Sequence, residues 1–185
     1  ARHGGACAAT AGVLYVVGGY DGESVLAAAE RFDPAAARWE VLAPMSAARG
    51  RCACAAEGGL VYALGGSDDD GRALRSAERL DPAGGAWEPL PPMPTPRSGG
   101  AAASLGGRVF VAGGRADSGD KLATVEVFDP SAGAWAAVAP MPTARDGCAA
   151  AALGDFLYVF GGRGTGQTLS AVERYDPRSG RWERL

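Results

Sequence analysis

The sequence predicts an all-β fold built from four similar units, each made of four short antiparallel strands. A pair of glycines closes an apolar run in every unit, at Gly18-Gly19, Gly65-Gly66, Gly113-Gly114 and Gly161-Gly162. The pairs recur about every 48 residues, a period that indicates a repeat architecture. No segment combines a 3.6-residue apolar period with helix caps, so we expect no significant helix.

Further markers recur in a fixed order in each unit. An arginine opens the unit, a glutamate follows the glycine pair, and an Asp-Pro pair and a tryptophan come next. The arginines are Arg2, Arg49, Arg97 and Arg145, the glutamates are Glu30, Glu78, Glu126 and Glu173, and the tryptophans are Trp39, Trp87, Trp135 and Trp182. These markers divide one domain into units 1–48, 49–96, 97–144 and 145–185.

Each strand of a unit is predicted from its own composition. The first follows the opening arginine and consists of small residues, as in 52–56. The second is the apolar run before the glycine pair, as in 13–17 and 156–160, where β-branched and aromatic side chains favour a strand. The third runs up to Asp-Pro, and the fourth starts at the tryptophan. Glycines and Asp-Pro pairs supply the turns between them.

Four strands in a unit of this length are typical of one blade of a β-propeller. The glycine pair, the glutamate before Asp-Pro and the spaced tryptophan resemble the Kelch repeat, and the resemblance covers the whole chain. It implies a closed ring of five to seven blades. We therefore expect these four blades to belong to a larger ring of about six, and a larger chain or assembly. A closed four-bladed ring is the alternative.

Residues that recur in every unit are expected to serve the blade itself. We expect the tryptophans to pack between neighbouring blades. Each repeated glutamate is expected to accept hydrogen bonds from a repeated arginine or from backbone amides, and losing one partner would strand a buried charge. The cysteines stand where sister units carry alanine or glycine, so we expect free thiols that act as small apolar groups. They are Cys7, Cys52, Cys54 and Cys148.

Function is expected where the units differ. Because successive strands are antiparallel, the start of the first strand, the end of the second and the start of the third meet at one face. Two sets of variable side chains belong to this face: Tyr20, Ser67, Arg115 and Arg163 follow the glycine pairs, and His3, Arg51, Ser98 and Asp146 follow the opening arginines. Loops held by a rigid scaffold are where binding residues concentrate, so we predict a partner-binding surface there.

The charges on this face differ between units. The first loop carries Asp21 and Glu23, and the second carries 68–70 with Arg72. The third loop is mixed, and the fourth has Arg163 and no acid before Gln167. The charged residues of the third loop are Arg115, Asp117, Asp120 and Lys121. We predict an acidic side over the first two blades and a more basic side over the last two. Arg51, Arg115 and Arg163 would hold a carboxylate-bearing peptide by charge-assisted hydrogen bonds.

The Kelch resemblance implies a protein-binding module rather than an enzyme. Kelch proteins that serve as substrate adaptors of cullin-type ubiquitin ligases grip an acidic peptide on the equivalent face. Tyr20, Arg51, Ser98, Arg115 and Arg163 match the residue types used there, and His3, Ser67 and Asp146 occupy equivalent positions. The resemblance thus implies a protein or peptide partner, with an acidic peptide as a candidate. It implies a cytoplasmic adaptor, or a scaffold in a cytosolic, cytoskeletal or ciliary assembly.

Two other functions stay open at this point. Some Kelch-like propellers are enzymes, and a sugar-acid mutarotase would need a non-repeated acid–base pair, for which His3 and Asp146 are the nearest candidates. A purely architectural element would instead bind through the edges of its blades.

Other classes of function lack the residues they need. The net charge of −3 gives no reason to expect nucleic acid, and no apolar run approaches the length of a membrane span. With His3 as the single histidine and no zinc-finger spacing among the cysteines, we expect no metal site and no cofactor. The acidic run 68–70 lacks the alternating ligands of a calcium loop.

Overall fold

The computed structural model describes residues 1–185, which form four separate antiparallel sheets of four strands each. Each sheet is one sequence unit, and its strands lie in chain order. The first two sheets contain β1 (Ala6–Thr10), β2 (Val13–Val17), β3 (Ala29–Asp33), β4 (Arg38–Val41), β5 (Ala53–Glu57), β6 (Leu60–Leu64), β7 (Ala77–Leu80) and β8 (Trp87–Leu90). The last two contain β9 (Ala101–Leu105), β10 (Arg108–Ala112), β11 (Val125–Asp129), β12 (Ala134–Val138), β13 (Ala149–Leu153), β14 (Phe156–Phe160), β15 (Val172–Asp176) and β16 (Arg181–Arg184). There is no helix, so the all-β, four-bladed prediction is confirmed.

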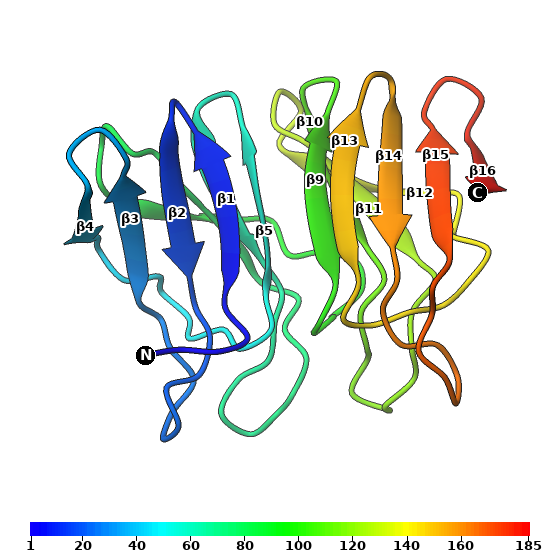
Figure 1. Ribbon diagram of the computed structural model, residues 1–185, viewed down its shortest axis with the longest axis horizontal. Coiled ribbons are helices and arrows are strands. Elements are labelled where there is room, and N and C mark those ends of the chain that lie inside the picture. Colours follow the sequence, from blue (N-terminus) through cyan, green and yellow to red (C-terminus); the bar gives the residue numbers. More distant parts are fainter.

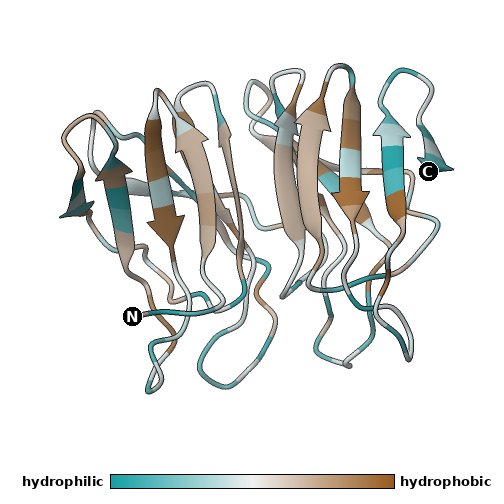
Figure 2. Cartoon of the chain, viewed as in Figure 1, coloured by the Kyte–Doolittle hydropathy of each residue, from teal (hydrophilic) through white to brown (hydrophobic).

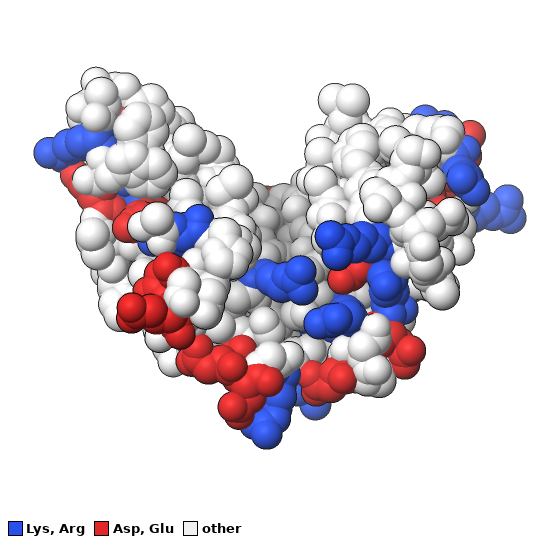
Figure 3. Space-filling view, turned by 60° about the horizontal axis from the view of Figure 1, so that its bottom comes forward, with Lys and Arg blue, Asp and Glu red and all other residues white.

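The four sheets are blades whose first strands lie innermost. Strands β1, β5, β9 and β13 contact one another in that order, each through its neighbours. Figure 1 shows the sheets with the long loops between the second and third strands gathered at one end, together with the N-terminus. Figure 3 shows a wide gap between the two ends of the arc. The blades therefore form an open arc, which differs from the alternative of a closed four-bladed ring.

The hydrophobic core is divided into three layers, one between each pair of neighbouring blades. In the first layer, Tyr15 and Val17 of β2 pack against Val61 of β6 and Leu80 of β7, with Met45 of the linker beside them. The second and third layers repeat this arrangement. Figure 2 shows that the inner strands are apolar along their length, whereas β4 and β16 at the rim are hydrophilic. Burial of one blade thus depends on the next.

Three of the four repeated tryptophans join neighbouring blades, as expected. Each lies partly buried beside a core layer and donates its indole N–H to a carbonyl of the preceding linker. The bonds join Trp87 to Ala43 at 3.0 Å, Trp135 to Pro91 at 2.8 Å and Trp182 to Ala139 at 2.8 Å. Trp39 differs, because no linker precedes its blade in the described residues, and it is 56% exposed.

A line of backbone hydrogen bonds ties the blades together near the axis. The amide of Arg51 donates to Gly4, that of Gly99 to Arg51 and that of Gly147 to Gly99, at 2.7–2.8 Å. Each of these residues is the second after the opening arginine of its unit. The bonds therefore fix the relative positions of the loops that follow the opening arginines. The chain contains no helix that could span a membrane.

Candidate functional site

Buried ion pairs between the repeated arginines and glutamates lie beneath the long loops. The pairs are Arg49–Glu78 at 2.8 Å, Arg97–Glu126 at 3.0 Å and Arg145–Glu173 at 2.9 Å. All six side chains are almost fully buried. Each repeated glutamate thus lies against the repeated arginine of its own blade, and Arg49 Nη2 donates a hydrogen bond to Oε1 of Glu78 at 2.8 Å. In the first blade the pair Arg2–Glu30 is also formed, at 2.9 Å, but the Glu30 side chain is 36% exposed.

Each of these arginines also holds both ends of a long loop. Arg49 Nη1 donates to the carbonyl of Gly65, which directly follows β6, at 3.0 Å. It donates as well to the carbonyl of Ser76, which precedes β7, at 2.8 Å. The other three arginines make the equivalent pair of bonds. Because a guanidinium has a rigid fork of donors, one buried side chain fixes where the loop leaves and re-enters the blade.

Two backbone amides of the preceding linker donate hydrogen bonds to Glu78, the repeated glutamate of the second blade. Oε2 of Glu78 accepts from the amide of Ser46 at 2.7 Å, and Oε1 accepts from that of Ala47 at 3.3 Å. Burial acts to raise the pKa of Glu78, but the hydrogen bonds from Arg49 and Ser46 outweigh it and the pKa is lowered. The carboxylate is therefore charged and serves as an anchor between two units.

The variable residues predicted to bind a partner meet in pairs above these anchors. His3 pairs with Tyr20, Gly50 with Ser67, Ser98 with Arg115, and Asp146 with Arg163, in each case as an antiparallel bridge. A third residue joins each pair from the far side of the loop, at Val25, Ala73, Lys121 and Thr168. We call the surface formed by these pairs, by Arg51 and by the long loops the loop face. The structure brings the predicted residues together on this one face.

Not all of the predicted side chains are equally available. His3, Arg51, Arg115 and Arg163 are exposed, whereas Tyr20, Ser67 and Asp146 are half-buried. Ser98 is only 5% exposed, so its hydroxyl offers little surface. Its position in the repeat gave no sign of this, because His3 at the equivalent place is exposed.

Arg51 has an unusual backbone conformation. Its φ is +52°, in the left-handed region, and it is the only non-glycine residue of the loop face with a positive φ. The other units carry Gly4, Gly99 and Gly147 at this place, with φ of +62°, +67° and +61°. A side chain in this region costs roughly 1–2 kcal/mol, and such strain is concentrated at functional sites. The second unit therefore has an arginine at a position where the backbone conformation of the repeat favours glycine.

Three hollows open on the loop face. One, of about 330 Å³, lies between the first two loops and includes His3, Tyr20 and Ser67. A second, of about 240 Å³, lies at the axis beside Asp146. Arg51 lines both of these. A third, of about 340 Å³, lies over the last two loops and includes Arg163. The predicted residues thus line several separate depressions rather than one deep pocket, and only the first two of these are joined through Arg51.

The charges of the loop face are divided between its two sides. Figure 3 looks toward this face and shows acidic side chains along the left and lower edge, with most basic side chains right of centre. The acidic residues of the first two loops include Asp21 and Asp69, and the basic ones of the last two blades include Lys121 and Arg163. The arrangement suits a partner that carries acidic groups on the part that meets the last two blades.

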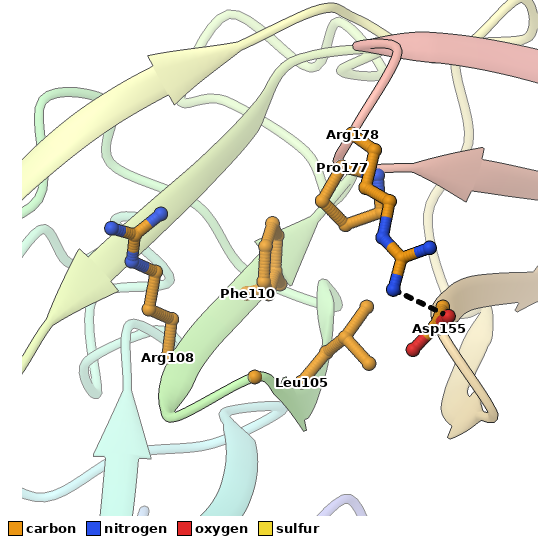
Figure 4. A pocket seen from close by; sticks show the side chains of 7 residues that line it. Leu105, Arg108, Phe110, Asp155, Pro177 and Arg178 are labelled. Carbon is orange, nitrogen blue, oxygen red and sulfur yellow. Dashed lines mark ion pairs between the residues drawn. The ribbon is translucent and has the colours of Figure 1, made fainter.

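The opposite face has a smaller hollow, of about 180 Å³, between the third and fourth blades. Figure 4 shows Leu105 and Phe110 facing it, with Arg178 reaching across to Asp155. That ion pair is 2.9 Å long, and both of its side chains are largely exposed. Exposed pairs of this kind contribute little binding energy or stability. This hollow offers a shallow apolar floor and no group of residues arranged for catalysis.

The residues considered for catalysis or metal binding stay apart. His3 lies in the first blade, edge-on to Tyr20 with ring centroids 5.2 Å apart, and Asp146 lies in the fourth. They line different hollows, so the structure does not assemble the acid–base pair that a mutarotase would need. No three residues among His, Cys, Asp and Glu lie together in a way that could hold a metal ion.

The four cysteines are unpaired in the structure. Cys7 is exposed, Cys52 and Cys54 are buried, and Cys148 is half-buried. Burial raises the pKa of Cys52 and that of Cys148 to about 11. Buried thiols with a raised pKa are poor nucleophiles and poor metal ligands, which fits a packing role.

Contacts between neighbouring loops were not foreseen. Oδ1 of Asp69 in the second loop accepts from the amide of Val25 in the first at 2.7 Å, and Oδ1 of Asp117 accepts from that of Ala73 at 2.5 Å. A signal was present, because Asp69 and Asp117 are both the third residue after a glycine pair.

Comparison with known proteins identifies the repeat. The family model for the Kelch motif matches the chain four times in succession, at residues 1–46, 48–94, 96–142 and 144–185. No curated protein matches the chain.

Proposed function

Because the chain belongs to the Kelch-repeat family, whose repeats are generally protein-interaction modules, we propose that it recruits a protein or peptide partner through the loop face. The fold of this family is typically non-catalytic. The variable residues of the four units are assembled on the loop face, whereas the repeated arginines and glutamates of the last three units are buried beneath it. This separation supports a surface that can be changed without loss of the blade.

The observation that carries the proposal is the left-handed Arg51. Its side chain stands between two hollows, in a conformation that the equivalent glycines adopt without strain. The Arg51 side chain forms no hydrogen bond and no ion pair with the rest of the chain, so no such contact compensates for the strain. A guanidinium held free in this way is suited to bidentate recognition of a carboxylate or a backbone carbonyl on a partner.

The variant Arg51→Gly tests this directly, because it installs the residue that the other three units use. Partners would be isolated with the chain as bait, and each would then be titrated against the purified wild type and variant. We expect binding to weaken about tenfold or more, the effect of removing one charge-assisted contact. The free energy of unfolding should change by less than about 1 kcal/mol, because relief of strain offsets the greater freedom of the unfolded chain.

A charge reversal on the other side of the loop face complements this test. Arg115→Glu combined with Arg163→Glu should abolish capture of an acidic partner. A matched control is Arg38→Glu combined with Arg181→Glu, which makes the same change in net charge at exposed positions that begin β4 and β16, away from the loop face. If partners bind the loop-face variants and the control alike, the choice of face is wrong.

The finer role is also part of the proposal. A substrate adaptor of a cullin-type ubiquitin ligase and a scaffold in a cytoplasmic, cytoskeletal or ciliary assembly would both use the loop face in this way. The two differ in the domain that accompanies the blades. Identification of the captured partner, and of ubiquitin ligase subunits beside it, would separate them.

A further inference from the structure

Each long loop leaves one backbone amide outside its own hydrogen bonds. In the third loop the amide of Ala116 donates to the carbonyl of Asp120 at 3.0 Å, and that of Leu122 donates to the carbonyl of Gly114 at 2.8 Å. The amide of Lys121 lies between these two bonds in the sequence, and it has no hydrogen-bond partner in the structure. It is the amide that faces the next loop.

The equivalent amides of the first two loops each carry a carboxylate. Val25 donates to Asp69 at 2.7 Å, and Ala73 donates to Asp117 at 2.5 Å. In both cases the acceptor belongs to the following loop and lies 44 residues further along the chain. The repeated geometry of the loop face therefore includes a carboxylate at this place.

The fourth loop does not supply that carboxylate to Lys121. The residue at the matching position is Thr165, and no hydrogen bond joins it to the third loop. In its place the structure has the hollow of about 340 Å³, lined by Lys121, Arg163, Gly164, Gly166, Gln167 and Thr168. Gly166 has open space around the position of a Cβ, so the wall of the hollow is low at that point.

The charges around this hollow favour an anion. Arg163 is exposed and forms no ion pair within the chain. The Nζ of Lys121 lies 4.0 Å from Oδ1 of Asp146, which is the nearest acidic partner, and the Asp146 side chain is 14% exposed. Asp120 accepts a hydrogen bond from Ser118 of its own loop at 2.7 Å. The guanidinium of Arg163 and the amides of Lys121 and Thr168 therefore remain free for a ligand.

We propose that this hollow is a carboxylate site, in which an aspartate or glutamate side chain of a partner peptide takes the place on the Lys121 amide that Asp69 and Asp117 take on its counterparts. The inference rests on the proposed function, because it assigns the partner's acidic group to one position on the loop face. Arg163 flanks the bound carboxylate and supplies the charge-assisted contact.

A titration followed by amide NMR tests the site. The probes are sodium acetate and an acetylated peptide of four glutamates, with sodium chloride and the matching glutamine peptide as controls. We expect the Lys121 amide to shift in a saturable way with acetate and with the acidic peptide only. The NMR signals of the Val25 and Ala73 amides should not shift, because these amides already donate to the carboxylates of Asp69 and Asp117. An equal response to chloride, or no response of Lys121, would overturn the proposal.

A variant that supplies the missing carboxylate gives a second test. Thr165→Asp should occupy the Lys121 amide from within the chain, as Asp69 occupies that of Val25. We expect about a tenfold loss of affinity for the acidic peptide and no shift of Lys121 with acetate. Ala86→Asp adds the same charge at an exposed position on the opposite side of the blades and should change affinity less than about twofold.

The two levels of the proposal fail in different ways. If Arg51→Gly weakens partner binding but Lys121 does not respond to acetate or to the acidic peptide, the carboxylate site is wrong and the loop face stands. If Arg51→Gly and the reversal of Arg115 and Arg163 leave partner binding unchanged, the loop face itself is wrong. A Thr165→Asp variant that binds the acidic peptide like the wild type also rejects the site.

Discussion

The buried pair Arg49–Glu78 should contribute far more to stability than the same pair in the first blade. The two side chains are at most 2% exposed and 2.8 Å apart, and Glu78 also accepts from two linker amides. The variant Glu78→Gln leaves the guanidinium of Arg49 charged and uncompensated. Breaking a buried pair in this way costs about 3–5 kcal/mol. In a chain of this size that lowers the thermal midpoint by roughly 6–20 °C.

The first blade provides the matched control. Glu30 forms the equivalent ion pair at 2.9 Å, but its side chain is 36% exposed and no preceding linker donates to it. An exposed pair contributes about 0–1 kcal/mol, so Glu30→Gln should lower the midpoint by less than about 4 °C. Circular dichroism during heating and in urea would measure both variants. Equal shifts for Glu78→Gln and Glu30→Gln would refute the argument from burial.

A double variant separates the net contribution of the ion pair to stability from the destabilisation that follows when only one partner is removed. Replacing Arg49 and Glu78 together by methionine removes both charges and keeps apolar volume in the core. Such replacements are often neutral or stabilising. We therefore expect the double variant to unfold at a higher temperature than Glu78→Gln. A double variant that is less stable than Glu78→Gln would show that the pair, and not the stranded charge, carries the energy.

Acid should weaken the same anchor. Hydrogen bonds from Arg49 and Ser46 lower the pKa of Glu78 in the folded chain below its usual value of 4.5, despite the opposing effect of burial. The stabilisation is therefore fully present above about pH 4.5 and is lost as the pH falls through the folded pKa. The unfolding free energy of Glu78→Gln should depend less steeply on pH in that range than that of the wild type.

Two further predictions concern the thiols and the glycine pairs. Burial raises the pKa of Cys148 from 9.0 to about 11, so at pH 8 its thiolate should be roughly a hundredfold scarcer in the folded chain than in urea. Alkylation of Cys148 should therefore be slower in the folded chain by at least that factor, as measured by mass spectrometry of the peptide 146–163. Equal rates in the folded chain and in urea would contradict the burial of this thiol. A Cβ at Gly66 would lie 2.7 Å from the carbonyl oxygen of Gly50, and Gly66 has a φ of +99°. Gly66→Ala should therefore lower the free energy of unfolding, measured in urea, by several kcal/mol. Gly59 has a φ of +83° and open space around it, so Gly59→Ala should lower it by only about 1–2 kcal/mol.

The blades could be predicted from the sequence because their markers repeat. A glycine pair, a glutamate and a tryptophan at fixed spacing indicate one supersecondary unit, and the structure has four of them. The loop face followed from strand direction alone, since alternate strand ends of an antiparallel sheet must meet. The pairing of Tyr20 with His3 and of Arg163 with Asp146 is the direct result.

Other features depend on a neighbouring unit and were beyond such reasoning. Trp39 and Glu30 have the same sequence context as their counterparts, but Trp39 is 56% exposed and the Glu30 side chain is 36% exposed, because neither contacts a linker in the structure. The burial of Ser98 and the unpaired amide of Lys121 depend on how close one loop lies to the next. A repeat pattern specifies the residues and strands of each unit, but it does not specify which residues of the neighbouring units will contact them. The contacts between units therefore have to be taken from the structure.

The division between buried anchor and variable loop also explains how this fold can acquire a binding site at little cost. Each arginine fixes both ends of its loop through main-chain carbonyls, which every residue type provides. Side chains after the glycine pair can therefore change without disturbing the blade. Arg51 is the one residue of the loop face whose backbone is strained as well, and even there we expect relief of strain in Arg51→Gly to be offset by the greater freedom of the unfolded chain. Binding and stability should thus respond to different substitutions: Arg51→Gly should weaken binding at nearly unchanged stability, whereas Glu78→Gln should lower stability.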